Sequence, residues 1–351
     1  MSGSTPPPSA SPSIEQLLID VHHHWMPEEH YHGVERWLRP GEEARRANGV
    51  LEIYRDNLCV LPNLTTLMYR ADAQLEAMDT VGVQTAVLHA ANWLEWLTMD
   101  NCRTFNDGMA AVVRRYPERF VGLAHVPPLG AGSLDEMTRC VQELGFRGVA
   151  VGCHLVPEGL PLDAPALRPF WKRVEELDVP VVVHPSLPLE YEMLRDYELI
   201  VSIGRMYSVT VAVMRLLLSA LLEEFPKLRF VLPHLGGSFF ALRERLLERH
   251  LMFGDENFEP KRARLNAALE RCYFETGPAL WKPISIRHAV DQFGPEHVLF
   301  GSDYPIHQSF LERAANTLRD ANFDTAVRRQ VGHDNAARLF GLPVLNTREG
   351  A

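Results

Sequence analysis

The sequence has few cysteines, no run of basic residues and no long apolar segment. Its five cysteines are odd in number and none forms a C-x-x-C pair, which argues against a disulfide framework or a zinc knuckle and favours a reducing cytoplasm. With 35 basic and 45 acidic residues the formal net charge is −10, so nucleic acid is not an expected partner. The apolar runs are too short to span a bilayer, and no membrane partner is expected.

The two ends differ in composition from the rest of the chain. Residues 1–13 are rich in proline and serine and lack both a basic start and an apolar stretch, so they predict a flexible tail rather than a signal peptide. We expect another short tail at 346–351. Residues 14–345 predict a single domain, because 46% hydrophobic and 23% charged residues are typical of a globular protein with a large core.

Short apolar runs alternate with helical patterns along this domain, which predicts an α/β fold of the (β/α)8 TIM-barrel type. Such a barrel takes about 250 residues and tolerates insertions up to about 400. A segment at about 25–70, with several prolines and glycines, predicts a lid inserted after the first strand. The predicted strands are 17–21, 84–89, 120–125, 146–152, 179–184, 228–233, 273–276 and 298–301, and the predicted helices are 70–81, 102–115, 134–144, 167–177, 209–225, 238–250 and 335–340.

Histidines and carboxylates stand at the ends of four of these strands. In the first strand, alternation of side chains places Asp20, His22 and His24 on one face and His23 on the other. His184, His234 and Asp303 each follow a buried apolar run. Because parallel barrels bring the carboxyl ends of their strands together, these groups predict one metal site. The alternative is a set of core histidines that are each hydrogen bonded separately.

Imidazole and carboxylate ligands suit zinc, with manganese or iron as rivals. Asp303 can bind the metal, exchange a proton or do both, and His234 can serve as the base. His23 is expected to hydrogen bond within the barrel wall, while Asp20 either supports a ligand or is an ordinary polar residue at a strand start.

Other residues leave two interpretations open. Trp93 and Trp96 either stack on a flat substrate or pack under the lid. The glycines before Ser238 either open an anion site at a helix start or form a tight turn. Three arginines either hold a substrate carboxylate or are simply solvated, namely Arg55, Arg70 and Arg205.

The order of these segments resembles the amidohydrolase-2 family of the metal-dependent amidohydrolase superfamily, in particular its aminocarboxymuconate-semialdehyde decarboxylase-like group. The resemblance implies a distorted barrel, the metal ligands His22, His24, His184 and Asp303, and His234 as the acid–base histidine. The segments that carry it are Asp20–His24, 78–83, 116–120, His184-Pro185, 234–239, Gly301-Ser-Asp-Tyr-Pro305 and 335–340.

The resemblance further implies nonoxidative decarboxylation. We therefore expect a metal-dependent decarboxylase, a carboxy-lyase, whose substrate is a small aromatic or conjugated unsaturated carboxylic acid. The alternative is a hydrolase that directs a metal-activated water at a lactone, an amide or a carbon–carbon bond. A non-catalytic barrel is disfavoured because every expected ligand and the base are present. The leucine-rich helix at 209–225 makes a homodimer the expected assembly.

Overall fold

Runs of valine, leucine and phenylalanine form parallel strands at the centre of the molecule. The computed structural model describes residues 17–155, 158–190, 192–253 and 258–344, so the tails predicted at 1–13 and 346–351 lie outside the described residues. The central strands are β1 (Leu18–His24), β5 (Val83–His89), β6 (Phe120–Gly122) continued by β7 (Ala124–His125), β8 (Val149–Gly152), β9 (Val181–His184), β10 (Phe230–Leu232), β11 (Cys272–Glu275) and β12 (Val298–Leu299).

These strands lie side by side in the order of the chain. β1, β5 and β6 pair in one sheet and β7 to β12 pair in another, and every pairing among them is parallel. The ring closes between the segment after β12 and β1. The amide of Val21 donates to the carbonyl of Phe300 at 3.0 Å, and that of Asp303 donates to the carbonyl of His22 at 2.8 Å. The predicted barrel is confirmed, and its two separate sheets are the distortion.

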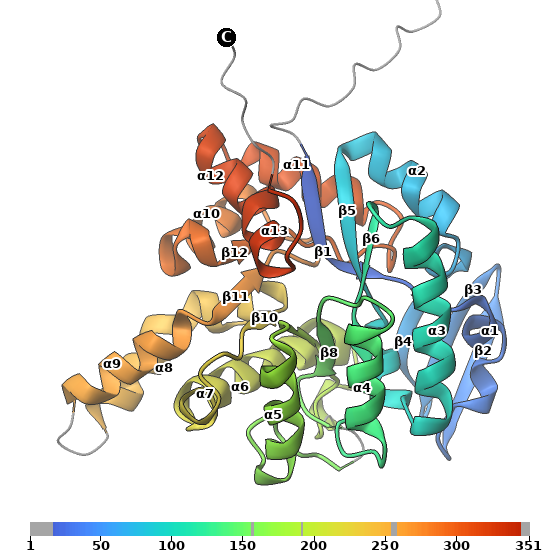
Figure 1. The fold of residues 1–351 in the computed structure, drawn as a ribbon, viewed down its shortest axis with the longest axis horizontal. Helices are drawn as coiled ribbons and strands as arrows, with labels where there is room; N and C mark the ends of the chain where they lie inside the picture. The colour runs from blue at the N-terminus through green and yellow to red at the C-terminus, as the bar shows by residue number, and fades with distance from the viewer. Residues whose placement is uncertain (1–16, 156–157, 191, 254–257, 345–351) are drawn as a thin grey trace, which may run out of the picture.

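Helices follow the strands, and most of them cover the outside of the ring (Figure 1). They are α2 (Ala71–Val81), α3 (Met99–Arg115), α4 (Ser133–Gln142), α5 (Arg168–Leu177), α6 (Arg205–Leu218), α7 (Leu221–Glu224), α8 (Phe239–Met252), α9 (Phe258–Leu269), α10 (Pro283–Phe293), α11 (Phe310–Asp320), α12 (Thr325–Arg329) and α13 (Asn335–Leu339). Gly82 ends α2 in the left-handed conformation that glycine adopts without strain.

The barrel interior is apolar at one end and polar at the other. Inward residues such as Ile19, Val87 and Val182 form a buried cluster with residues of α13 and with Phe340, which lies just beyond that helix. That helix therefore closes the end where the strands begin. The histidines at the strand ends lie at the opposite end, where the side chains of distant segments meet.

The segment between β1 and α2 contains its own small sheet. After α1 (Glu28–His32), the strands β2 (Glu42–Ala47), β3 (Val50–Arg55) and β4 (Leu58–Leu64) pair antiparallel. Both hairpin turns have residues at positive φ, with Asn48 and Gly49 in the first and Asp56 and Asn57 in the second, as two-residue hairpins require. The sequence predicts an insertion here, whereas its strand structure was not expected.

This inserted sheet rests on segments that follow β5 and β9. The indole of Trp96 donates to Glu42 at 2.5 Å, Arg205 donates to the carbonyl of Val60 at 3.1 Å, and Arg195 to that of Asp56 at 2.7 Å. The insertion is thus fastened at the end of the barrel where the strands finish.

The predicted helix at 209–225 differs from the structure at both ends. A π-helical turn at Ile200–Gly204 leads into α6, and extended backbone at Ser219 separates α6 from α7. By length and composition alone, Ile200–Leu218 could cross a membrane, so the expectation that every apolar run is too short was wrong. Burial of Val209, Val213 and Leu216 against the barrel accounts for much of this apolar composition.

Candidate metal centre

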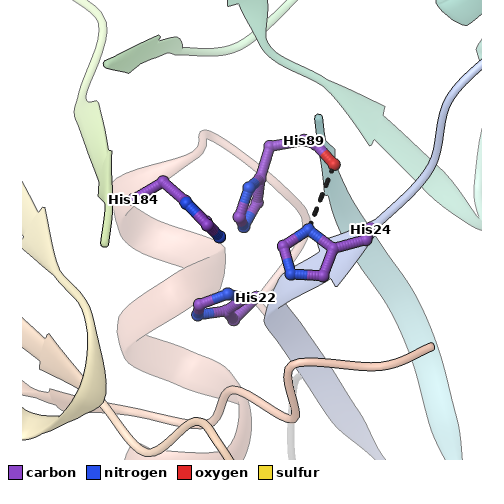
Figure 2. Close-up of side chains that lie close together, drawn as sticks. All are labelled: His22, His24, His89 and His184. Atoms are coloured by element: carbon purple, nitrogen blue, oxygen red, sulfur yellow. Dashed lines mark hydrogen bonds between the residues drawn. The ribbon is translucent and has the colours of Figure 1, made fainter. Parts of the chain in front are cut away.

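Four buried histidines meet at the mouth of the barrel. His22 and His24 come from β1, His89 ends β5 and His184 ends β9, and their rings lean toward a common point (Figure 2). One ring nitrogen of each lies within 4.8 Å of one nitrogen of every other. Three of the expected ligands are therefore brought together, and His89 joins them.

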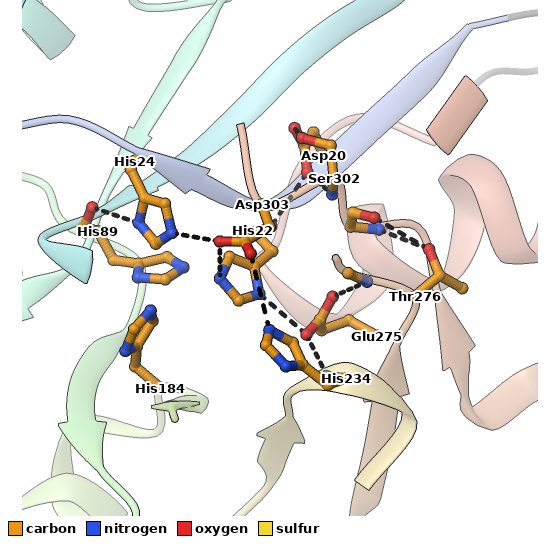
Figure 3. Close-up of polar contacts among 12 residues, drawn as sticks. Asp20, His22, His24, His89, His184, His234, Glu275, Thr276, Ser302 and Asp303 are labelled. Atoms are coloured by element: carbon orange, nitrogen blue, oxygen red, sulfur yellow. Dashed lines mark hydrogen bonds and ion pairs between the residues drawn. The ribbon is translucent and has the colours of Figure 1, made fainter. Parts of the chain in front are cut away.

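Asp303 lies beside this cluster and bridges it to His234. Its Oδ1 is 2.8 Å from His24 Nε2 and 3.3 Å from His22 Nε2, while its Oδ2 is 4.0 Å from His234 Nε2 (Figure 3). Asp303, His22 and His234 form a further group whose ligand atoms lie within 4.8 Å of one another. All five expected site residues thus occupy one site.

Glu275, at the end of β11, supports the other side of His22. Its Oε1 accepts from His22 Nδ1 at 2.9 Å and from the amide of His234 at 2.6 Å, and its Oε2 accepts from the amide of Gly277 at 2.5 Å. A Cβ at Gly301 would collide with this carboxylate, so glycine is required there. With Nδ1 bonded to Glu275, His22 presents Nε2 toward the cluster, where a bound metal would replace a proton.

The backbone is left-handed at both residues that face each other across the site. His234 has φ 54° and Asp303 has φ 63°, a region that non-glycine residues rarely adopt and that is often found at functional sites. The turn after His234 packs closely, because a Cβ at Gly237 would lie 2.5 Å from the carbonyl of Met206. The amide of Ser238 donates to Thr210 Oγ1 at 2.8 Å. These contacts favour the tight-turn interpretation of the glycines over an anion site.

His23 lies outside the cluster, as its strand phase predicts. Its Nδ1 donates to Asp20 Oδ2 at 3.0 Å. The expectation that Asp20 shares a face with His22 was wrong, because the pairing of β1 with β5 is irregular between Asp20 and His23. Asp20 instead accepts from the amide and hydroxyl of Ser302 at 3.0 and 2.5 Å. Asp20 therefore anchors the segment that carries Asp303 and supports the site without facing the cluster.

Burial and charge set the protonation of the site. Burial disfavours an imidazolium, but the carboxylates of Glu275 and Asp303 outweigh it and raise the pKa of His22 to about 10. Burial also opposes ionisation of Asp303, yet His22 and His24 hold the pKa of its carboxyl well below the usual range. Burial lowers the pKa of His234 to about 4, so this ring is neutral at pH 7. An ionised carboxylate therefore faces a neutral imidazole, a pair suited to proton transfer.

The donor set fits a divalent transition metal. Neutral imidazoles and a carboxylate are ligands for zinc, iron and manganese. In the described part of the chain, both ring nitrogens of His234 are buried without a hydrogen-bond partner. The negative potential that raises the pKa of His22 would equally attract a cation.

Arg205 is the candidate arginine nearest this chemistry. It opens α6, donates to Val60 of the inserted sheet at 3.1 Å and is partly buried. Its charge contributes to lowering the pKa of His184 and His234, after the larger effect of burial, and Asp303 in turn supports the charge of Arg205. Its guanidinium therefore lies close to the site.

The other candidates have structural contacts of their own. Arg70 is exposed in an ion pair, and Arg55 donates to Glu42 at 2.7 and 2.9 Å. Trp96 is buried and donates to the same Glu42, which favours packing of the insertion over stacking on a substrate. The side chain of Trp93 lies outside the described residues.

A cavity of about 360 Å³ opens beside the cluster. Its lining is largely apolar, with Arg39, Glu95 and Ser186 among its polar residues, and includes Gly152, the register partner of His184. The clustered histidines themselves are not part of this lining among the described residues. Its volume is in the range of small-molecule pockets.

Sequence reasoning missed His89 and Glu275. Each is the last residue of its strand, which is the signal that identified His184. His89 ends the second predicted strand and could have been found in this way. Glu275 lacked a motif that set it apart from other strand-end carboxylates.

A family model described as amidohydrolase matches residues 19–342. The chain belongs to the amidohydrolase family. Gamma-resorcylate decarboxylase from Rhodococcus jostii (strain RHA1) is 31% identical over 290 residues, which cover 77% of this chain and 87% of that protein. The predicted family and its decarboxylase-like group are confirmed.

Solved structures agree with this membership. A 2,6-dihydroxybenzoate decarboxylase in complex with 2,6-dihydroxybenzoate is 25% identical, with a TM-score of 0.74 over 93% of this chain and 99% of the other. A dihydroxybenzoic acid decarboxylase from Polaromonas sp. JS666 with bound manganese is 24% identical, with a TM-score of 0.74 over 93% and 97%.

The metal can be tested at the H-x-H of β1, where His23 provides an internal control. We expect about one equivalent of divalent metal by elemental mass spectrometry in the wild-type protein, and its loss in a His22→Ala, His24→Ala double variant. His23→Ser should keep the metal, because His23 bonds to Asp20 outside the cluster. Metal retained in the double variant, or lost in His23→Ser, would contradict the assignment.

Glu275→Gln tests the support of His22. The amide keeps the shape but removes the charge that favours the Nδ1–H tautomer, so affinity for zinc should fall about 10- to 100-fold. Competition with a chromophoric chelator measures the affinity. Glu296→Gln, on the surface near the far end of the barrel, serves as the control, and equal affinities in all three proteins would refute the support role.

Proposed function

We propose that this protein is a metal-dependent nonoxidative decarboxylase of a small aromatic or conjugated unsaturated carboxylic acid. Its curated relatives include decarboxylases of this kind. The observation that carries the proposal is Asp303, which faces the histidine cluster with one carboxylate oxygen and His234 with the other. One group thereby links a cation-binding site to a proton-transfer site.

In this proposal His22, His24, His184 and Asp303 hold the metal, and zinc is the proposed ion. When bound, the metal supplies a Lewis acid that stabilises negative charge on substrate oxygens. Glu275 orients His22 from the outside of the site. Bound manganese in the Polaromonas structure supports a divalent ion and leaves manganese as the rival.

The chain itself must deliver a proton to carbon. When the bond between the ring carbon and the carboxyl carbon breaks, carbon dioxide leaves and the bond electrons stay on the ring carbon, which then takes a proton. We propose that Asp303 and His234 carry this proton between a substrate oxygen and the carbon, because Oδ2 and Nε2 face each other at 4.0 Å. No water is consumed.

Substrate binding is proposed at the adjoining cavity. Arg205 supplies the positive charge for a carboxylate at the site, and the inserted sheet, fastened through Val60 and Glu42, acts as the lid. The exclusion of water by such a cover strengthens the electrostatic contacts within.

A hydrolase is the alternative, because the same base and ion can direct water at a carbonyl. The two reactions differ in their products. Decarboxylation releases carbon dioxide, whereas hydrolysis adds one water to the products.

The decisive experiment incubates the metal-loaded protein with a panel of hydroxybenzoic acids in deuterated water. We expect carbon dioxide release and one deuterium at the vacated ring carbon. Asp303→Asn should slow turnover about 10²- to 10⁴-fold because it removes the proton carrier, with folding verified by circular dichroism and metal content measured in parallel. Hydration of the product, or wild-type rates in Asp303→Asn, would overturn the proposal.

We further propose a cytoplasmic homodimer. Ile203, Tyr207 and Val211 expose apolar side chains along one face that begins in the π-helical turn and continues on α6. Light scattering should give twice the chain mass, and Tyr207→Glu should shift it toward the monomer, since it places a charge on this face. Met252→Glu, at an exposed apolar residue of α8, is the control. A monomeric wild-type protein would refute this assembly.

A further inference from the structure

We propose that His89 is a further metal ligand, so that a fourth imidazole joins the ligands named above at the mouth of this barrel. This inference rests on the metal site proposed above. It assigns a role to a residue that neither the motif reasoning nor the resemblance selected, and it narrows the choice of metal.

The register of the barrel places His89 on the ligand face. His89 pairs directly with His24 across the parallel strands β1 and β5. Residues paired in this way project to the same side of a sheet. The carbonyl of His89 also accepts from His24 Nδ1 at 3.3 Å, which leaves His24 Nε2 as the nitrogen that faces the site. His89 thus orients one ligand through its backbone while its own ring enters the cluster.

The four rings surround one point at nearly equal spacing (Figure 2). The ring centres of His89 lie 4.7, 4.6 and 5.2 Å from those of His22, His24 and His184, and the remaining three separations are 4.9, 5.4 and 5.2 Å. Imidazoles that share one tetrahedral ion at about 2 Å have ring centres about 5 Å apart. The interplanar angles of 51 to 89° exclude stacking as the reason for the cluster.

The ring of His89 is buried, and its two nitrogens form no hydrogen bond with the described residues. His89 is 1% exposed. A buried polar group without a partner is costly, which points to a ligand. His125, at the end of the neighbouring strand β7, shows the ordinary outcome, since its Nδ1 bonds to the carbonyl of Leu123 at 2.7 Å and its Nε2 accepts from the amide of Ala90 at 3.0 Å.

A fourth imidazole among the ligands changes the expected metal preference. Imidazole suits zinc, copper, iron and nickel, whereas carboxylate and water suit manganese and magnesium. We therefore infer preference for zinc over manganese.

The test compares wild-type protein with His89→Phe after removal of metal and reloading with cobalt or zinc. Phenylalanine keeps a planar ring but has no donor atom. We expect a changed visible spectrum of bound cobalt and a zinc affinity weaker by about tenfold or more. Thermal stability of the metal-free variant should equal or exceed wild type, because the His89 ring makes no hydrogen bond, while stabilisation by added zinc should shrink.

His154→Phe is the matched control, because His154 lies near the cavity but outside the cluster. His89→Asn is the second variant in case phenylalanine overfills the site. Wild-type cobalt spectra and zinc affinity in both His89 variants would overturn the inference, as would an equal loss in His154→Phe. These measurements do not depend on turnover. Inactivity toward the hydroxybenzoic acids would therefore contradict the proposed reaction and leave the assignment of His89 standing.

Discussion

Two carboxylates, the buried Glu275 and the partly buried Asp303, lie at opposite sides of His22. Burial of two such groups costs several kcal/mol each unless positive partners compensate. His22 provides that compensation, which is why its pKa rises to about 10 even though burial works against its charge. The same arrangement fixes which nitrogen of His22 faces the cluster. The electrostatics of the whole site depend on this one contact.

The closure of the barrel is what places Asp303 in that contact. The segment after β12 donates to the carbonyl of His22 through the amide of Asp303, and Asp20 binds both polar groups of Ser302 next to it. Ring closure and site assembly are therefore the same set of hydrogen bonds. A change that loosened β1 against this segment would disturb the fold and the position of Asp303 together.

Strand ends were predictable from the sequence because a buried strand leaves an unmistakable apolar run before each polar residue. This was enough to bring His22, His24, His184, His234 and Asp303 to one place. The prediction from alternating side chains failed at Asp20, because the irregular pairing of β1 with β5 changes the direction of its side chain. The periodicity of one strand does not reveal how that strand pairs with its neighbour.

The inserted sheet escaped prediction for a related reason. Its strand β2 alternates few apolar residues, and its order comes from hairpin turns and from contacts with Trp96 and Arg205, which lie far away in the sequence. The role of Glu275 likewise depends on its hydrogen bond to His22, which is 253 residues earlier. Such long-range partners become visible when the barrel is closed.

The depth of the histidine cluster bears on the kind of reaction that the site favours. The four rings are almost entirely buried, and Asp303 is 13% exposed, so the proton-carrying group is the part of the site nearest to solvent. A reaction that consumes water needs a path for each new water to the ion. Decarboxylation consumes no water, and burial favours it by strengthening the charges that stabilise the ring carbon's electrons. Burial and proton access thus favour loss of carbon dioxide over attack by water.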